Sequence, residues 1–385
     1  MPLQIRAARV VEERRGVVGK ELAVAGRQRR GLREISNIPP QITKRFGDLK
    51  ITAPGKSCEN KKLTKINGTS TSQKSTGNKA PVEKAVKALE TPVVKHEIED
   101  IDKLHEGNIY LVSEYAKDVY KYLMYLENKF SINKWPVPGS KITDTMRTML
   151  VDWLVDVQVE FNLMQETLHI AVSILDRYLG IDSEFEKNVF QLVGISALSL
   201  ACKYEEMLAP LVDDFIYLCK NAYQRSEHID MEKKMLKALN YDLGRPVAVT
   251  FLRRYNMAAK ADKLQHCYSK YFIDLALLDN KFSHIKPSLV AAAASFIAMC
   301  VIKDKVDASH WTPTMVHYSS YTMNEIKPVA MQMTKMIISI SKSTFDSVKR
   351  KYSKSLFLGV SMKMISSMEI IKTVASCSTV AVTNS

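Results

Sequence analysis

The stretch that decides the fold reads LVGISALSLAC and runs from Leu192 to Cys202. Apolar residues occupy almost every face of this segment, and small residues such as Gly194 and Ala197 are spaced through it. A helix of this composition is typical of the centre of a bundle, where other helices surround it closely. A similar segment, LVAAAASFIAMC, follows 97 residues later, from Leu289 to Cys300. Together they predict two repeats, each built around one central helix.

Helical periodicity continues on both sides of these segments. From Met146 to Val157 the apolar residues recur at i, i+3, i+4 and i+7, with Thr143 or Asp144 available as the helix cap. The same pattern predicts helices over residues 166–179, 189–206, 212–220 and 226–239. Strand-like alternation is absent from the sequence, so we predict an all-α fold of two tandem five-helix repeats with a helix before them.

A break at Gly244-Arg245-Pro246 separates the two repeats. We therefore divide the chain into four parts. The predicted parts are an N-terminal tail (1–107), a first repeat with its preceding helix (108–244), a second repeat (245–360) and a C-terminal tail (361–385).

The positive charge is concentrated in the first hundred residues. Residues 1–100 contain 21 Lys and Arg against 11 Asp and Glu, whereas the other 285 residues contain 34 against 30. The first hundred also hold a single aromatic residue, Phe46. Such a segment buries too little apolar surface to offset its ordering entropy, so we predict a disordered basic tail. Because the repeats are almost neutral, no direct nucleic-acid binding is expected of them.

The sequence offers no catalytic or metal-binding motif. The eight histidines lack metal-ligand spacing, and the six cysteines form no C-x-x-C pair, which favours a reducing environment. Residues 54–57 read PGKS, but a phosphate loop needs an earlier glycine where Lys50 stands. The most apolar stretch, residues 288–302, is shorter than the roughly 20 residues of a membrane span. We therefore expect no enzyme, no cofactor, no metal site and no membrane partner.

Lys203 is placed unusually, at the end of the apolar central helix and before Glu205 and Glu206. A lysine is costly to bury without a partner. One interpretation is a solvent-reaching side chain or an internal pair with Glu205 or Glu206. The other is a cation at a docking surface for another protein's backbone carbonyls. The residues alone favour the first interpretation.

Four segments strongly resemble the cyclin box, and the resemblance extends over about residues 108–360. They are MRTMLVDWLVDV (146–157), QETLHIAVSILDRYL (165–179), QLVGISALSLACKYEEM (191–207) and LGRPVAVTFLRR (243–254). Their amino-acid sequences are similar to those of mitotic, B-type cyclins. The resemblance implies a regulatory subunit that binds and activates a cyclin-dependent serine/threonine kinase, drives the G2/M transition and has no active site. One departure is Met207-Leu208-Ala209-Pro210, where the family usually has two prolines, and we expect a looser loop there.

The resemblance also implies which residues meet the kinase. In the family a Lys–Glu pair, matching Lys203 and Glu232, hydrogen-bonds the kinase near its mobile C helix, and the helix before the first repeat docks as well. This favours the docking interpretation of Lys203. The implied kinase-binding residues are Tyr115, Asp118, Val119, Lys203, Glu206 and Glu232.

A second site implied by the resemblance recruits substrates that carry an R-x-L motif. Its apolar part would be an adaptable groove, and Asp156 would receive the arginine of the motif. Leu150 has an alternative role in the core. The implied substrate-docking residues are Met146, Met149, Leu150, Trp153, Asp156 and Gln191.

The tail contains RRGLREISN at residues 29–37. This fits the R-x-x-L-x-x-I-x-N destruction box of mitotic cyclins, with Arg29, Leu32, Ile35 and Asn37 at its four positions. The arginine suits an acidic site and the leucine an apolar pocket on a ubiquitin-ligase receptor. The motif implies ubiquitin-dependent destruction at the end of mitosis.

The expected partners are thus a mitotic cyclin-dependent kinase in a heterodimer, the anaphase-promoting ubiquitin ligase with its receptor subunits, and R-x-L substrates. The resemblance implies a location in cytoplasm and nucleus, with shuttling between them, and at the centrosome or spindle. The alternative is a cyclin-fold transcription factor, or a transcriptional cyclin, that binds the basal transcription machinery or nucleic acid. That alternative needs a basic face on the repeats, whose surplus is small.

Overall fold

A computed structural model describes residues 98–103, 106–108, 112–132, 141–182 and 186–376 of the chain. Within these ranges the regular structure is helical throughout, which confirms the all-α prediction. Most of the predicted basic tail, including the destruction box, lies outside the described residues.

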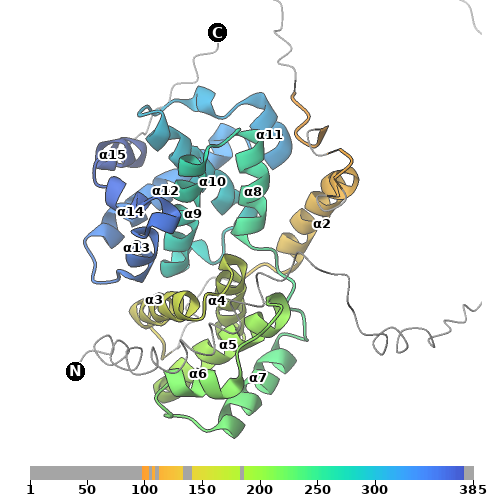
Figure 1. The fold of residues 1–385 in the computed structure, drawn as a ribbon, viewed down its shortest axis with the longest axis vertical. Coiled ribbons are helices and arrows are strands. Elements are labelled where there is room, and N and C mark those ends of the chain that lie inside the picture. The colour runs from red at the N-terminus through yellow and green to blue at the C-terminus, as the bar shows by residue number, and fades with distance from the viewer. Residues whose placement is uncertain (1–97, 104–105, 109–111, 133–140, 183–185, 377–385) are drawn as a thin grey trace, which may run out of the picture. The chain divides into compact units, whose positions relative to one another are not determined.

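The first repeat has the five helices that the sequence predicts (Figure 1). They are α3 (Asp144–Glu160), α4 (Gln165–Leu179), α5 (Phe190–Glu205), α6 (Val212–Leu218) and α7 (Arg225–Ala238). Thr143 is the cap of α3, since its Oγ1 accepts a hydrogen bond from the Met146 N–H at 3.3 Å. α4 ends at Leu179, immediately before Gly180, where the sequence predicts its end.

The second repeat repeats this order after the break at residues 244–246. Its helices are α8 (Ala248–Ala258), α9 (Lys263–Leu278), α10 (Pro287–Ile302), α11 (Pro313–Ser319) and α12 (Met323–Ser341). α10 is buried on nearly all sides, because α8, α9 and α12 pack around it (Figure 1). Its small residues let these helices approach closely, so it holds the central position that the sequence predicts.

In the first repeat the central helix is α5, and Gly194 is the point of closest approach to α3. A Cβ atom at residue 194 would lie 2.7 Å from the Cδ atoms of Leu150. Only glycine therefore allows Leu150 to sit on α5 as it does. Leu150 is 6% exposed, so it belongs to the core.

The helix before the repeats, α2 (Ala116–Lys129), packs on the second repeat beside α8 (Figure 1). The hydroxyl of Tyr120 donates a hydrogen bond to the Thr250 carbonyl at 3.1 Å. At the other end, the buried Glu127 carboxylate accepts hydrogen bonds from the Ser288 N–H and Oγ, at 3.1 and 2.7 Å. A carboxylate there also complements the N-terminal dipole of α10. These contacts hold α2 in place while its outer face stays exposed.

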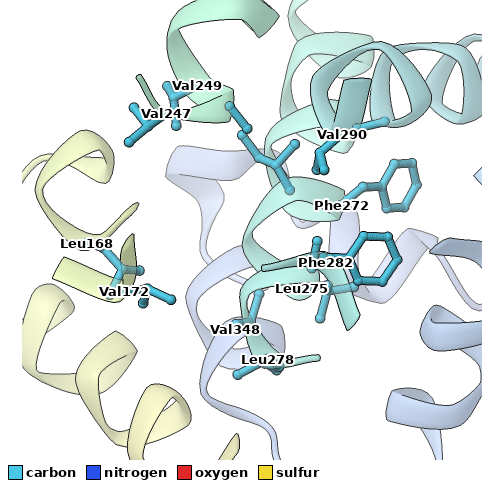
Figure 2. Close-up of a cluster of buried hydrophobic side chains, with 14 of the residues drawn as sticks. Leu168, Val172, Val247, Val249, Phe272, Leu275, Leu278, Phe282, Val290 and Val348 are labelled. Atoms are coloured by element: carbon cyan, nitrogen blue, oxygen red, sulfur yellow. The ribbon is translucent and has the colours of Figure 1, made fainter. Parts of the chain in front are cut away.

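The two repeats meet in one apolar cluster. Figure 2 shows Leu168 and Val172 of α4 in the same cluster of buried side chains as Val247 and Leu275 of the second repeat. Burial of this surface is the main apolar contribution to holding the repeats together.

Buried charges also cross the boundary between the repeats. Arg147 on α3 forms two hydrogen bonds with the Asp176 carboxylate, at 2.6 and 2.7 Å, and a third with the Leu277 carbonyl at 2.9 Å. Asp274 on α9 is bound by His169 of α4 at 2.9 Å and by Lys351 at 2.6 Å. Every one of these charged groups has a partner, as burial requires.

The structure corrects both tail boundaries. Residues 98–103 were assigned to the disordered tail, but Ile101 is only 5% exposed. Asp102 forms a buried bidentate ion pair with Arg254 of α8, with Nη2 to Oδ2 at 2.6 Å. The sequence could not show this, because the two residues lie 152 positions apart.

Residues 361–376 were assigned to the C-terminal tail, but they are packed. Three further helices follow α12, namely α13 (Ser347–Tyr352), α14 (Val360–Lys363) and α15 (Met368–Ser376). α15 packs on α12 and α10, and its Ile371 is completely buried. Because α14 and α15 are short, too few residues lie in each for a helical periodicity to be recognised in the sequence.

Candidate functional site

Lys203 and Glu232 form an ion pair at the surface of the first repeat. Lys203 lies in the last turn of α5 and Glu232 in α7, and Nζ is 2.7 and 2.6 Å from the two carboxylate oxygens. The Ser199 hydroxyl donates a further hydrogen bond to Glu232 at 2.6 Å. The two side chains differ in exposure: that of Lys203 is 46% exposed and that of Glu232 only 8%. The pair thus presents its cation to solvent and keeps its anion inside.

The surroundings keep Glu232 charged. Burial by itself would raise the pKa of this carboxyl group, but interactions with His228, Lys203 and Ser199 outweigh burial and lower the pKa to about 2. The fixed carboxylate positions the ammonium, which has three N–H donors. Glu232 takes up two of these directions, so Lys203 keeps donor capacity for a carbonyl of another protein.

The partner of Lys203 is therefore neither Glu205 nor Glu206, the two candidates for an internal pair in the sequence. Glu206 is also among the expected kinase-binding residues, and that role stays a prediction. Its Oε1 accepts hydrogen bonds from the Met164 N–H and the Thr167 hydroxyl, both at 2.7 Å. These groups lie at the start of α4, so Glu206 caps that helix and supports the site from within.

Large exposed apolar side chains follow Lys203 closely in sequence. The loop after α5 holds Met207, which is 99% exposed, and Leu208, which is 89% exposed. Tyr204 and Leu211 are also exposed. Exposed apolar residues gathered in this way are typical of a surface that another protein covers. We call residues 203, 204, 207, 208 and 211, together with Glu232, the open end.

A second exposed surface lies on α2 and the short turn before it, Ser113–Tyr115. Tyr115 is 60% and Val119 is 49% exposed, and Asp118 is exposed beside them. Tyr122 is 58% exposed and stands three positions after Val119 on the same face. Tyr122 is not among the residues implied by the resemblance, although helical spacing from Val119 indicates that it shares this face.

The expected substrate-docking residues are divided between surface and core. Met149 is 49% exposed, whereas Met146, Trp153 and Gln191 are half-buried and remain accessible. Leu150 is buried against Gly194. It therefore has the core role that the sequence offers as its alternative to docking. We call Met146, Met149, Trp153 and Gln191 the α3 patch.

Asp156 lies at the end of this patch and already has a partner. Nη2 of Arg350, on α13, is 3.0 and 2.9 Å from its two carboxylate oxygens. No local pattern in the sequence could show this contact, because 194 positions separate the residues.

The described residues contain no cluster of three or more His, Cys, Asp or Glu side chains that could hold a metal ion. None of the helices within the described ranges is long and apolar enough to span a membrane. His266, next to Cys267 in sequence, has its Nδ1 2.8 Å from the Asn256 amide. Residues 54–57 lie outside the described part of the chain, as do Arg29, Leu32, Ile35 and Asn37.

The fold and these surfaces define an all-α protein of two tandem repeats whose first repeat carries an exposed, partly apolar surface around an ion pair. Two family descriptions match it: "Cyclin, N-terminal domain" over residues 118–244 and "Cyclin, C-terminal domain" over residues 246–366.

Two relatives sharpen the assignment. A G2/mitotic-specific cyclin-B of Hydra viridissima is 43% identical over 265 residues, covering 69% of this chain and 66% of that protein. A G2/mitotic-specific cyclin-B of Hydra vulgaris is 40% identical over 283 residues, covering 74% of this chain and 77% of that protein. The chain belongs to the cyclin family, among the mitotic B-type cyclins.

A solved structure, a viral cyclin from herpesvirus saimiri, is also similar. It shares 23% sequence identity at a TM-score of 0.47, and the alignment covers 57% of this chain and 97% of that one.

Proposed function

We propose that this protein is the regulatory subunit of a mitotic cyclin-dependent serine/threonine kinase, which it binds and activates to drive the G2/M transition. The observation that carries the proposal is the open end, where a half-exposed lysine is held by a buried glutamate and the loop that follows carries almost fully exposed apolar side chains. Apolar residues contribute affinity in such an interface, and the fixed cation contributes orientation. The exposed face of α2, with Tyr115, Asp118 and Val119, forms a second contact surface for the same kinase.

Activation needs no catalytic residue in this chain. A kinase alternates between conformations, and its C-helix glutamate reaches the catalytic lysine in only one of them. A subunit that binds this conformation more tightly increases its population. The open end would do so by docking beside the C helix, with Lys203 donating to backbone carbonyls there.

The experiment is a comparison of Lys203→Ala with Lys237→Ala, an exposed lysine on α7, in binding and activation assays with a purified mitotic cyclin-dependent kinase. We expect at least tenfold weaker association for Lys203→Ala and unchanged association for Lys237→Ala, since loss of a charged hydrogen bond in an interface typically costs about 2 kcal/mol or more. Equal binding by both variants would contradict the docking role.

We further propose that the α3 patch recruits substrates with an R-x-L motif to the kinase. Met149 and Trp153 offer an accessible, adaptable apolar surface on α3. Replacing both with alanine should raise the KM for substrates that carry the motif and leave short peptides without it unaffected. Equal losses for both substrates would indicate damage to the core instead.

Finally, we propose that residues 29–37 are a degradation signal for the anaphase-promoting ubiquitin ligase, with passage between cytoplasm and nucleus before destruction. The sequence motif supports this, because Arg29 and Leu32 are the two anchors of the pattern. Replacing both with alanine should lengthen the half-life in anaphase extract and leave kinase activation unchanged. Loss of that variant at the wild-type rate would contradict the proposal.

A further inference from the structure

Asp156, the acidic residue of the α3 face, is occupied by an arginine of this same chain. Arg350 Nη2 lies 2.9 and 3.0 Å from the two oxygens of the Asp156 carboxylate. The guanidinium also binds Asp346 through Nε at 3.1 Å and the Ser347 hydroxyl through Nη2 at 3.0 Å. Arg350 therefore has partners at the start of α13 in addition to Asp156.

The ion pair stands at the end of the α3 patch. Asp156 follows Met149 by seven positions and Trp153 by three, and this spacing puts all three side chains on one face of the helix. The side chains of Arg350 and Asp156 are 55% and 40% exposed, so water and other molecules reach the pair. An exposed pair of this kind is weak and exchangeable.

The surroundings of the guanidinium are acidic. Asp156 faces it from α3, and Asp346 faces it from the start of α13. Two carboxylates thus meet one arginine, and the local charge remains negative while Arg350 is bound. The geometry itself shows that this place accepts a guanidinium.

We propose that Arg350 is a built-in competitor for the arginine of a docking peptide and so sets the affinity of the α3 patch for R-x-L segments. Without peptide, Arg350 occupies Asp156. When a peptide arginine arrives, Arg350 withdraws to Asp346 and Ser347. The apparent affinity is then reduced by the fraction of molecules in which Asp156 is occupied. The inference rests on the proposed function, because it assumes that the α3 patch binds such peptides.

The test is the Kd of a fluorescent R-x-L peptide, measured by anisotropy on the full chain in complex with its kinase. Arg350→Ala should bind the peptide about two- to fivefold more tightly, the range expected for removal of one exposed ion pair. Lys349→Ala is the matched control, because it removes an exposed positive charge from the same helix without touching Asp156. It should leave the Kd within about 1.5-fold, which separates competition from a general change of charge.

A second variant makes the mechanism specific. In an Asp156→Asn background, Arg350→Ala should have no effect on the Kd, because competitor and peptide then lack their shared acceptor. The inference is overturned if Arg350→Ala binds equally or more weakly, if Lys349→Ala gives the same gain, or if wild type and Arg350→Ala both fail to bind the peptide. Phosphorylation of a peptide without the motif, by the same complexes, reports kinase activation separately. With normal activity, either of the first two results refutes this inference alone, whereas failure of both proteins to bind the peptide also refutes substrate recruitment by the α3 patch. Loss of that activity in the wild-type complex refutes the proposed kinase-activating role.

Discussion

The face of the first repeat that meets the second repeat and the open end of the same repeat hold their charges in opposite ways. At the boundary, Arg147 and Asp176 are 1% and 3% exposed, and the arginine also binds a carbonyl of the second repeat. At the open end, Glu232 is enclosed while Lys203 is half exposed. At the boundary the charged side chains find their hydrogen-bond partners within the chain. At the open end, the ammonium of Lys203 keeps part of its hydrogen-bonding capacity for another protein. This difference separates a surface that completes the fold from one that is available to a partner.

The largest effect is expected from breaking the boundary at Arg147. Arg147→Ala would leave the buried Asp176 carboxylate without its counter-ion, which typically costs about 3–5 kcal/mol of unfolding free energy. Urea unfolding measures the loss. Thr145→Ala, an exposed change two positions earlier on the same helix, should alter stability by no more than about 0.5 kcal/mol. A loss below about 1 kcal/mol for Arg147→Ala would show that the boundary does not depend on this pair.

An intermediate, pH-dependent effect is expected at Asp152, which joins α3 to the start of α13. Its carboxylate accepts hydrogen bonds from the Ser347 N–H and hydroxyl at 3.1 and 3.0 Å. Burial raises its pKa from 3.8 to about 6, although the Ser347 hydrogen bonds oppose this shift. The folded state thus favours the protonated form, so the contribution of Asp152 to stability is complete below about pH 4 and is lost as the pH rises through about 6.

Asp152→Asn removes this titration and keeps an acceptor for the Ser347 N–H. Relative to wild type, the variant should gain up to about 3 kcal/mol of unfolding free energy between pH 4 and pH 7, from about 2 pKa units at 1.36 kcal/mol each. Denaturant unfolding across that range gives the two curves. Parallel curves would mean that Asp152 is not held in a perturbed state.

The smallest effect on stability is expected at the open end. Met207→Ser with Leu208→Ser should change the unfolding free energy by no more than about 0.5 kcal/mol, because both side chains are almost fully exposed. On the proposed function, the same variant should bind the kinase at least tenfold more weakly. Met257→Ser, at an exposed methionine of the second repeat, is the matched control and should bind normally. A large loss of stability in the double variant would show that the loop supports the fold.

The sequence predicts the structural features that depend on residues close together along the chain. Helical periodicity predicts the five helices of the first repeat, and small residues mark α5 and α10 as central. The position before the periodic run makes Thr143 and Asp144 the two candidate caps, and Thr143 is the one that caps α3. These features depend on spacings of three or four residues, which a single sequence displays.

Contacts between distant residues could not be predicted in this way. Arg350 reaches Asp156 across 194 positions and Arg254 reaches Asp102 across 152 positions, and nothing in their local sequence identifies the partner. Glu206 illustrates the same limit within one motif: it follows Lys203 by three positions in sequence, but its side chain turns to the start of α4. The residue roles implied by resemblance remain predictions where they concern a partner that the chain meets only in a complex.

The Asp102–Arg254 pair has a mechanical consequence. The guanidinium of Arg254 lies between the rings of Tyr120 and Tyr318, 5.0 and 4.8 Å from their centres, and so ties residues 98–103 to α2 and α11 at once. A pulling force applied to the chain before residue 98 would reach this junction before it reached the core of either repeat. The resistance of the folded part to extraction from its N-terminal side would then depend first on how readily one buried arginine releases one aspartate.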